Sequence, residues 1–148
     1  VENTLLNVEN INDGIGPLGI GVDIIEIDRF EDIAKSFPKG VSRRLFTDEE
    51  LSDKRINTPQ FMASRFAAKE AVMKCMGRGM DSIGFTDIQI DNLPSGQPVV
   101  KLSGRAFEVA DSMGITEIML SISHSMSHAI AFAMAIGKGR ESCEASKE

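Results

Sequence analysis

Residues 59–76 read PQFMASRFAAKEAVMKCM, and this is the longest helix that the sequence predicts. Thr58 suits the N-cap position and Pro59 suits the first helical position, while Gly77 suits a C-terminal stop. The signals therefore predict a helix from Pro59 to about Met76. Small and apolar side chains recur along one stripe of this helix, which predicts that the stripe packs against the rest of the protein.

Two neighbouring charges on this helix have different predicted environments. Glu70 follows Ala63 and Ala67 along the apolar stripe, so we expect it to point inward or into a cleft. Lys69 lies off the stripe and is expected to be a surface or rim charge. Glu70 and Lys74 are four residues apart, and in this order they also suit a simple intrahelical ion pair. Both interpretations of Glu70 stay open at this point.

Residues 18–27, LGIGVDIIEI, are rich in β-branched side chains and predict the first strand. Asp23 interrupts this apolar run and would share a strand face with Gly21 and Ile25. A buried carboxylate is costly unless a partner compensates it, so Asp23 either accepts backbone N–H groups or binds a cation. Gly19 and Gly21 do not make a dinucleotide-binding motif, because the third glycine of that motif is missing.

Asp23 and Glu70 together indicate a possible metal site. If the two carboxylates converge, they offer the oxygen ligands that a hard cation such as Mg²⁺ prefers. A cation there would attract phosphate, and Lys74 lies one helical turn past Glu70, where it can contact the same phosphate.

The remaining elements mix helices and strands without regular βαβ spacing, which favours an α+β fold. Helices are expected over residues 29–36, from Asp48 in the capping-box sequence TDEE, and over residues 104–113 before Gly114. Strands are expected over residues 86–91 and 99–102 and over two later alternating runs, Ile118 to Ile122 and Ile130 to Ile136. Alanines alternate with large residues in the last run, and this alanine face would let another element pack closely.

Length and composition are those of a small globular protein with one domain. The chain has 148 residues, 42% of them hydrophobic and 26% charged. No apolar run approaches the roughly 20 residues of a membrane helix. Residues 1–17 are expected to form a flexible extension, residues 18–137 the domain and residues 138–148 a polar tail. Two cysteines without a motif, and the lack of a basic secretory leader, favour a reduced cytoplasmic setting.

The net charge of −6 is unevenly distributed. Residues 1–28 hold six acids and no base, whereas residues 29–44 hold five bases and two acids, a local excess of three positive charges. This basic segment is either a solvated face or a docking surface for an acidic partner. Nucleic acid is the less favoured partner, because the segment is small and has few interleaved aromatic residues.

The two histidines do not indicate a metal site. His124 ends a predicted strand, and bonding to the backbone is its simplest interpretation. His128 opens the last strand without an evident partner. Both lie in strands and a turn rather than on one helix, so zinc is not supported. The sequence Gly77-Arg-Gly79 follows the negative end of the long helix, so a phosphate there would need side-chain cations or loop amides.

Three motifs, taken in order and spacing, resemble those of the bacterial holo-[acyl-carrier-protein] synthases, the short class of phosphopantetheinyl transferases. They are GIGVDIIEIDR at residues 19–29, RFAAKEAVMK at residues 65–74 and SISH at residues 121–124. The resemblance covers about residues 18–137. It implies the 4′-phosphopantetheinyl transferase-type fold, an antiparallel sheet with a long packed helix.

The resemblance also implies an activity. Family members transfer 4′-phosphopantetheine from coenzyme A to a serine of apo-acyl carrier protein and release adenosine 3′,5′-bisphosphate. Fatty-acid biosynthesis is the expected pathway, with polyketide synthesis left open. The implied cofactor is Mg²⁺, bound by Asp23 and Glu70, with pyrophosphate oxygens and water as its other ligands. The serine proton would pass to a Mg²⁺-bound water that one carboxylate orients, or directly to a carboxylate.

Further roles follow from the same resemblance. The implied residues are Asp23, Glu70 and Lys74 for catalysis, Lys74, Gly77 and His124 for coenzyme A, and Arg29 and Arg44 for the acidic carrier protein. Family members form homotrimers with active sites at subunit interfaces, and the alanine face of the last strand is compatible with such packing. Neither nucleic acid nor a membrane is an expected partner.

The chain departs from the family pattern at two places, and other functions stay open. Gly77-Arg-Gly79 replaces a common Gly-Thr-Gly, and His128 stands where an aromatic residue is common, so contacts with coenzyme A can differ. One alternative is a Mg²⁺-dependent hydrolase of the coenzyme A pyrophosphate. Another is a non-catalytic module that binds a carrier protein or a nucleotide. A requirement for apo-carrier protein separates the transferase from the hydrolase.

Overall fold

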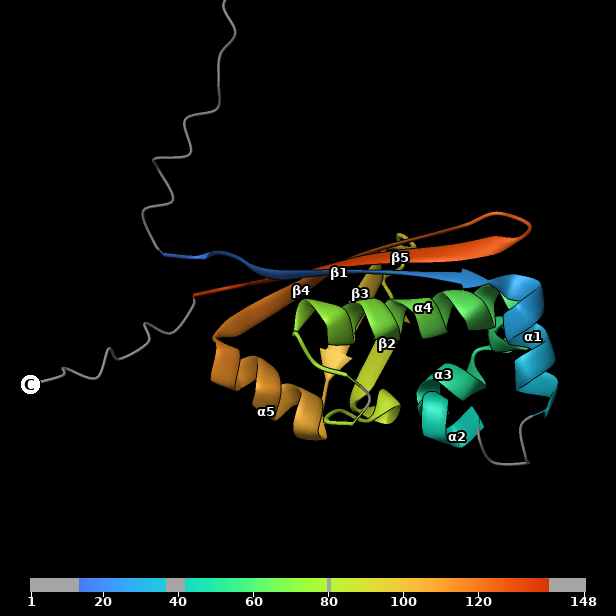
Figure 1. Cartoon of the computed structure of the whole chain (residues 1–148), viewed down its shortest axis with the longest axis horizontal. Helices are drawn as coiled ribbons and strands as arrows, with labels where there is room; N and C mark the ends of the chain where they lie inside the picture. Colours follow the sequence, from blue (N-terminus) through green and yellow to red (C-terminus); the bar gives the residue numbers. More distant parts are fainter. Residues whose placement is uncertain (1–13, 37–41, 80, 139–148) are drawn as a thin grey trace, which may run out of the picture.

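The computed structural model describes residues 14–36, 42–79 and 81–138. Three antiparallel strands form the main sheet, in the order β1 (Gly16–Glu26), β5 (His128–Gly137) and β4 (Ile115–His124). The long helix α4 (Pro59–Cys75) runs along one face of this sheet (Figure 1). Strands β2 (Ile88–Asn92) and β3 (Pro98–Leu102) pair as a separate antiparallel hairpin. The predicted α+β class, an antiparallel sheet with a long packed helix, is confirmed.

Alternation along β5 decides which face of the sheet meets α4. The alternate alanines from Ala129 to Ala135 are all buried, and three of them belong to the main core with the inner side of α4. Ile130 and Phe132 lie on the opposite, exposed face of the sheet. The close packing predicted for the alanine face is therefore made by α4 of the same chain. That face is not available to another subunit, which corrects the expectation that it could serve a trimer.

Two glycines let β1 approach α4 closely. A Cβ atom on Gly21 would overlap the backbone carbonyl oxygen of Ala71, and one on Gly19 would overlap that of Cys75. Any larger residue would push the strand away from the helix. Asp23 lies two residues further on the same face and is therefore held beside the second half of α4.

Most helix boundaries follow the predicted signals. Thr47 and Glu50 form the expected capping box at the start of α3 (Asp48–Ser52). Helix α5 (Gly104–Met113) ends as expected at Gly114, whose φ of +75° suits glycine. No helix in the described part of the chain is long and apolar enough to cross a membrane.

Other boundaries differ from the prediction. Helix α1 (Ile27–Ser36) begins two residues early, because Ile27 is buried in a small cluster beside α4. The 3₁₀ helix η3 (Phe85–Asp87) stands at the predicted start of β2. Two short elements were not predicted, α2 (Ser42–Leu45) and the 3₁₀ helix η2 (Lys54–Asn57). The expected stop after α1, at residues 38–40, lies outside the described residues.

Thr58 occupies the predicted N-cap position of α4 but does not cap the helix with its side chain. Its hydroxyl donates instead to the carbonyl oxygen of Arg55 at 2.8 Å. Pro59 at the first helical position is confirmed, and proline has no N–H that a cap would need to satisfy.

Lys69 is fully buried, so the prediction of a surface or rim charge is wrong. Its Nζ donates to Glu50 Oε2 at 2.6 Å and to the carbonyl oxygens of Leu45 and Phe85 at 2.8 and 3.0 Å. Glu50 also accepts two backbone N–H groups, one at the start of α3 and one from β2. The segments that cover this side of α4 are distant in sequence, so the helical pattern alone could not show the burial.

Candidate functional site

Asp23 and Lys74 form an ion pair that links β1 to the second half of α4. Lys74 Nζ lies 2.8 Å from Asp23 Oδ1, and it donates a second hydrogen bond to the carbonyl oxygen of Val22 at 3.0 Å. The Asp23 side chain is 14% exposed, and its Oδ2 atom is buried without a hydrogen-bond partner among the described residues. A buried carboxylate oxygen without a partner is costly, which makes this position suitable for a ligand.

Glu70 lies beside this pair and is half-buried. Burial is the main cause that raises the pKa of Glu70, the charge of Asp23 raises it further, and Lys74 opposes both. Among the ion pairs of residues 14–36, 42–79 and 81–138, Lys74 joins Asp23 rather than Glu70. The simple intrahelical pair is therefore not the arrangement that forms, and Glu70 meets Asp23 as a like charge.

These side chains fit a hard divalent cation. Two carboxylates, one with an unpartnered oxygen, are ligands of the type that Mg²⁺ takes. No group of three or more His, Cys, Asp or Glu side chains that could hold a metal ion occurs in the described residues. A cation beside Asp23 and Glu70 would therefore need further oxygen ligands from a substrate or from water, as Mg²⁺ commonly does in phosphate sites.

A cavity of about 750 Å³ opens beside the first turns of α4, and His124 lies in its wall. Arg55 and Arg65 lie in the same wall, with their guanidinium carbons 4.7 and 4.4 Å from the ring centroid of Phe61. Such contacts are cation–π interactions. Two cations beside an aromatic ring and a histidine suit an anionic ligand that carries a flat ring.

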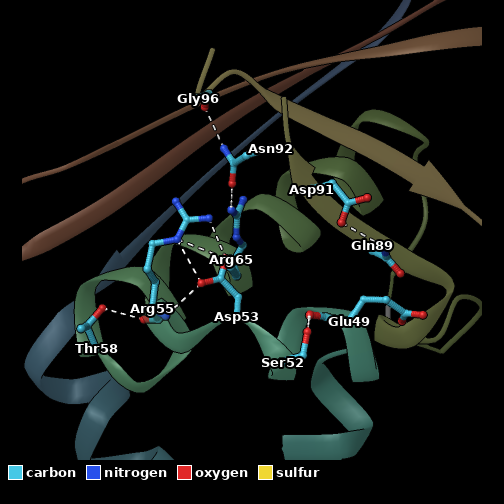
Figure 2. Close-up of polar contacts among 10 residues, drawn as sticks. All are labelled: Glu49, Ser52, Asp53, Arg55, Thr58, Arg65, Gln89, Asp91, Asn92 and Gly96. Atoms are coloured by element: carbon cyan, nitrogen blue, oxygen red, sulfur yellow. Dashed lines mark hydrogen bonds and ion pairs between the residues drawn. The ribbon is translucent and has the colours of Figure 1, made fainter. Parts of the chain in front are cut away.

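Arg65 is the buried member of this pair of arginines, with 4% of its surface exposed. Its guanidinium donates to Asn92 Oδ1, and Asn92 donates in turn to the carbonyl oxygen of Gly96 at 2.7 Å (Figure 2). Burial is the main cause that lowers the pKa of Arg65, but an arginine remains charged in proteins. A buried cation held by a neutral amide retains an attraction for anions.

The predicted site residues fall into two groups on different sides of α4. Asp23, Glu70 and Lys74 form one cluster, whereas His124 lines the cavity, whose walls include none of these three. Arg65 and Glu70 are five residues apart on the helix, which turns their side chains about 140° from one another. The cavity and the carboxylate cluster are therefore separate surfaces of one chain.

The other predicted residues lie at exposed positions. Gly77 follows the end of α4 with a φ of +63°, which suits glycine. Arg29 on α1 and Arg44 on α2 are both exposed. The two helices that carry these arginines lie at the same end of the molecule (Figure 1).

Sequence reasoning missed Arg55, Phe61, Arg65 and Asn92. One signal was present, because Phe61 and Arg65 are four residues apart on a helix and must be neighbours. Arg55 and Asn92 carry no comparable signal, since they reach the cavity from η2 and β2.

Comparison with known proteins gives consistent matches. Residues 19–133 match the model of the 4′-phosphopantetheinyl transferase superfamily. The holo-[acyl-carrier-protein] synthase of Clostridium novyi (strain NT) is 41% identical over 133 residues, which cover 88% of this chain and 96% of that protein. The Helicobacter pylori synthase, solved in complex with coenzyme A, is 32% identical with a TM-score of 0.70, covering 78% of this chain and 98% of that one. The Bacillus anthracis synthase, solved with coenzyme A (3′,5′-ADP), is 31% identical with a TM-score of 0.67. The match covers 82% of this chain and 97% of that one.

Proposed function

The chain belongs to the holo-[acyl-carrier-protein] synthases of the 4′-phosphopantetheinyl transferase superfamily, and from that premise we propose its reaction. This enzyme transfers phosphopantetheine from coenzyme A to an acyl carrier protein. We further propose that the acceptor is a serine of the apo-protein, that the reaction requires Mg²⁺, and that adenosine 3′,5′-bisphosphate is released.

The observation that carries the proposal is the unpartnered Oδ2 of Asp23 beside Glu70 and Lys74. Asp23 and Glu70 would hold Mg²⁺, which when bound supplies charge neutralisation on the pyrophosphate of coenzyme A. Lys74 is half exposed and can donate to the phosphate that leaves. Such transfers need positioning and neutralised charge more than covalent help. One of the two carboxylates accepts the serine proton, directly or through a water that it orients.

We propose that the cavity with Arg55, Arg65 and His124 takes the nucleotide end of coenzyme A. The phosphates of that end are anions, which guanidinium groups bind well, and its adenine is a flat ring of the kind that aromatic side chains contact. Gly77 lies past the end of α4, next to Lys74, and leaves space for the pyrophosphate.

We propose a homotrimer in which each active site lies between two subunits. The cavity and the carboxylate cluster lie on different sides of α4, so one coenzyme A can join the cavity of one subunit to the carboxylates of the next. The outer face of the main sheet supports an assembly, because Ile20, Val22 and Ile24 are 53–64% exposed, and the strand register pairs Val22 with the exposed Phe132. Exposed apolar faces of this kind mark protein interfaces.

We propose that Arg29 and Arg44 dock the carrier protein, which in this family is acidic. Both are exposed, and the helices α1 and α2 that carry them lie at one end of the molecule, where the two arginines can meet a negatively charged surface (Figure 1). Because coenzyme A and acyl carrier protein are intracellular molecules, we place the enzyme in the cytoplasm, in fatty-acid biosynthesis.

The test is the intact mass of purified apo-acyl carrier protein after incubation with this protein, coenzyme A and Mg²⁺. We expect a gain of one phosphopantetheine that EDTA abolishes and that excess Mg²⁺ restores. Unmodified carrier protein with consumed coenzyme A would instead identify a pyrophosphate hydrolase. Unmodified carrier protein with intact coenzyme A, across several carrier proteins, would leave only a binding module.

A further inference from the structure

Asp53 makes an unusually complete set of contacts with one neighbour, Arg55. It caps η2, because its Oδ1 atom accepts the backbone N–H of Arg55 at 2.9 Å. The same carboxylate accepts the side chain of Arg55 through three more contacts, Nε to Oδ1 at 3.0 Å, Nε to Oδ2 at 3.1 Å and Nη2 to Oδ2 at 2.6 Å (Figure 2). One carboxylate therefore fixes both the backbone and the guanidinium of Arg55.

The Arg55 side chain needs a fixed partner because it lies in the cavity wall and is largely exposed to solvent. That side chain is 58% exposed, and a free arginine at such a position samples many rotamers. Thr58 fixes the carbonyl oxygen of Arg55 from the other end of η2. With the backbone fixed and the guanidinium bound by Asp53, the side chain stays over the ring of Phe61.

Arg65 also lies over the ring of Phe61, but other contacts fix its side chain. It is buried, and its contact to Asn92 involves a neutral amide rather than a carboxylate. Among the described residues, an acid forms an ion pair with Arg55, whereas Arg65 donates to the neutral amide of Asn92.

We propose that Asp53 is a positioning residue that holds Arg55 ready for a phosphate at the nucleotide end of coenzyme A. The inference rests on the proposed function of the cavity and deepens it. Charge alone would argue against an acid here, since a carboxylate near an anionic ligand repels it. Preorganisation acts in the opposite direction, because an arginine already in place loses less freedom when the ligand binds. The two effects predict opposite results when the acid is removed.

The experiment is calorimetric titration of the full chain with adenosine 3′,5′-bisphosphate. Asp53→Asn keeps an oxygen for the cap of η2 but removes the charge and one of the two acceptors. We expect the Kd of the bisphosphate for this variant to rise about threefold to tenfold. The matched control is Asp91→Asn. Asp91 lines an adjoining pocket, outside the lining of the proposed cavity, and is paired with Lys101. The Kd for this control should stay unchanged or fall slightly.

Two further measurements separate positioning from a general structural role. In steady-state assays, Asp53→Asn should raise KM for coenzyme A by a similar factor, with kcat and KM for the carrier protein unchanged. In an Arg55→Ala background, Asp53→Asn should no longer weaken binding of the bisphosphate, because the group that it positions is gone.

The outcomes also distinguish this inference from the function on which it rests. If Arg55→Ala weakens binding but Asp53→Asn leaves it unchanged or tighter, the positioning role is excluded and the nucleotide site stands. If Asp53→Asn still weakens binding without Arg55, Asp53 acts through the fold and the inference fails. If the bisphosphate does not bind to the wild-type chain, or if Arg55→Ala leaves its binding unchanged, the cavity is not the nucleotide site and both proposals fall.

Discussion

Two lysine–carboxylate pairs on α4 have similar lengths and different surroundings. Lys69 meets Glu50 at 2.6 Å with both side chains nearly fully buried, and Lys74 meets Asp23 at 2.8 Å with the lysine 49% exposed. Lys69 Nζ has three acceptors, whereas Asp23 retains an oxygen without a partner in the part of the chain that the structure describes. A satisfied pair can only hold the fold together, and an incomplete pair can bind something else.

The burial of Lys69 has a consequence for its own protonation. Burial is the main cause that lowers the pKa of Lys69, and the charge of Glu50 opposes it. Such a pair adds little net stability compared with an apolar core, but removing one partner leaves a buried charge. The structural pair should therefore be more sensitive to a single substitution than the open one.

The largest expected effect is the loss of stability in Lys69→Met. This variant leaves Glu50 buried without its cation, so the free energy of unfolding should fall by about 3–5 kcal/mol. The same substitution five residues later, Lys74→Met, should cost about 1 kcal/mol or less, because that pair is partly in solvent. Urea denaturation of both variants measures the difference. Equal losses would show that burial does not distinguish the two pairs.

The second effect concerns activity at the open pair. Asp23→Asn keeps the shape of the side chain but removes its charge, so kcat should fall about 100-fold to 1000-fold, with stability changed by less than about 1 kcal/mol. Asp91→Asn, at another aspartate paired with a lysine, should retain full activity. Transfer assays over a range of Mg²⁺ concentrations provide the measurement. Full activity in Asp23→Asn would remove Asp23 from the site.

A third variant tests the close approach that brings Asp23 to α4. Gly21→Ala places a Cβ against the carbonyl oxygen of Ala71, so the free energy of unfolding should fall by about 1–3 kcal/mol, and kcat should fall with it. Gly16→Ala, on the same strand with no atom near its Cβ position, should change neither by a measurable amount. Thermal unfolding and the transfer assay are sufficient. A neutral Gly21→Ala would mean that the strand can move away without affecting the site.

The smallest effect has the opposite sign. The pKa of Glu70 is raised above its ordinary 4.5 in the folded chain, so its contribution to stability is present at low pH and is lost as the pH rises above 4.5. Glutamine does not titrate, so metal-free Glu70→Gln should be about 0.5 kcal/mol more stable than the wild type at pH 7 and no more stable at pH 4. Thermal unfolding at both pH values tests this. A variant less stable at pH 7 would show that burial and the charge of Asp23 do not destabilise the ionised form of Glu70.

The sequence predicted the elements whose signals are local. The helix from Pro59, the strand with Asp23 and the alternating last strand were all found, because each depends on periodicity or on a cap within a few residues. The sequence also singled out Asp23 and Glu70, since each charge interrupts an apolar pattern, whereas their convergence followed only from the packing of β1 against α4. The start of α1 was misplaced, because the burial of Ile27 depends on a neighbour that is distant in sequence.

The rest was decided only when the chain folded. Lys69 and Lys74 belong to the same motif, but Lys69 is buried and Lys74 is half exposed, because different segments cover the two sides of α4. Glu50 lies 19 residues before Lys69, and Asp23 lies 51 residues before Lys74. The cavity likewise gathers Arg55, Asn92 and His124 from separate elements. The sequence by itself determined the longer helices, the strands and the two candidate carboxylates, because short-range patterns encode them. Only the tertiary structure decided which charges are buried and which share a site, because burial depends on segments that local periodicity does not place.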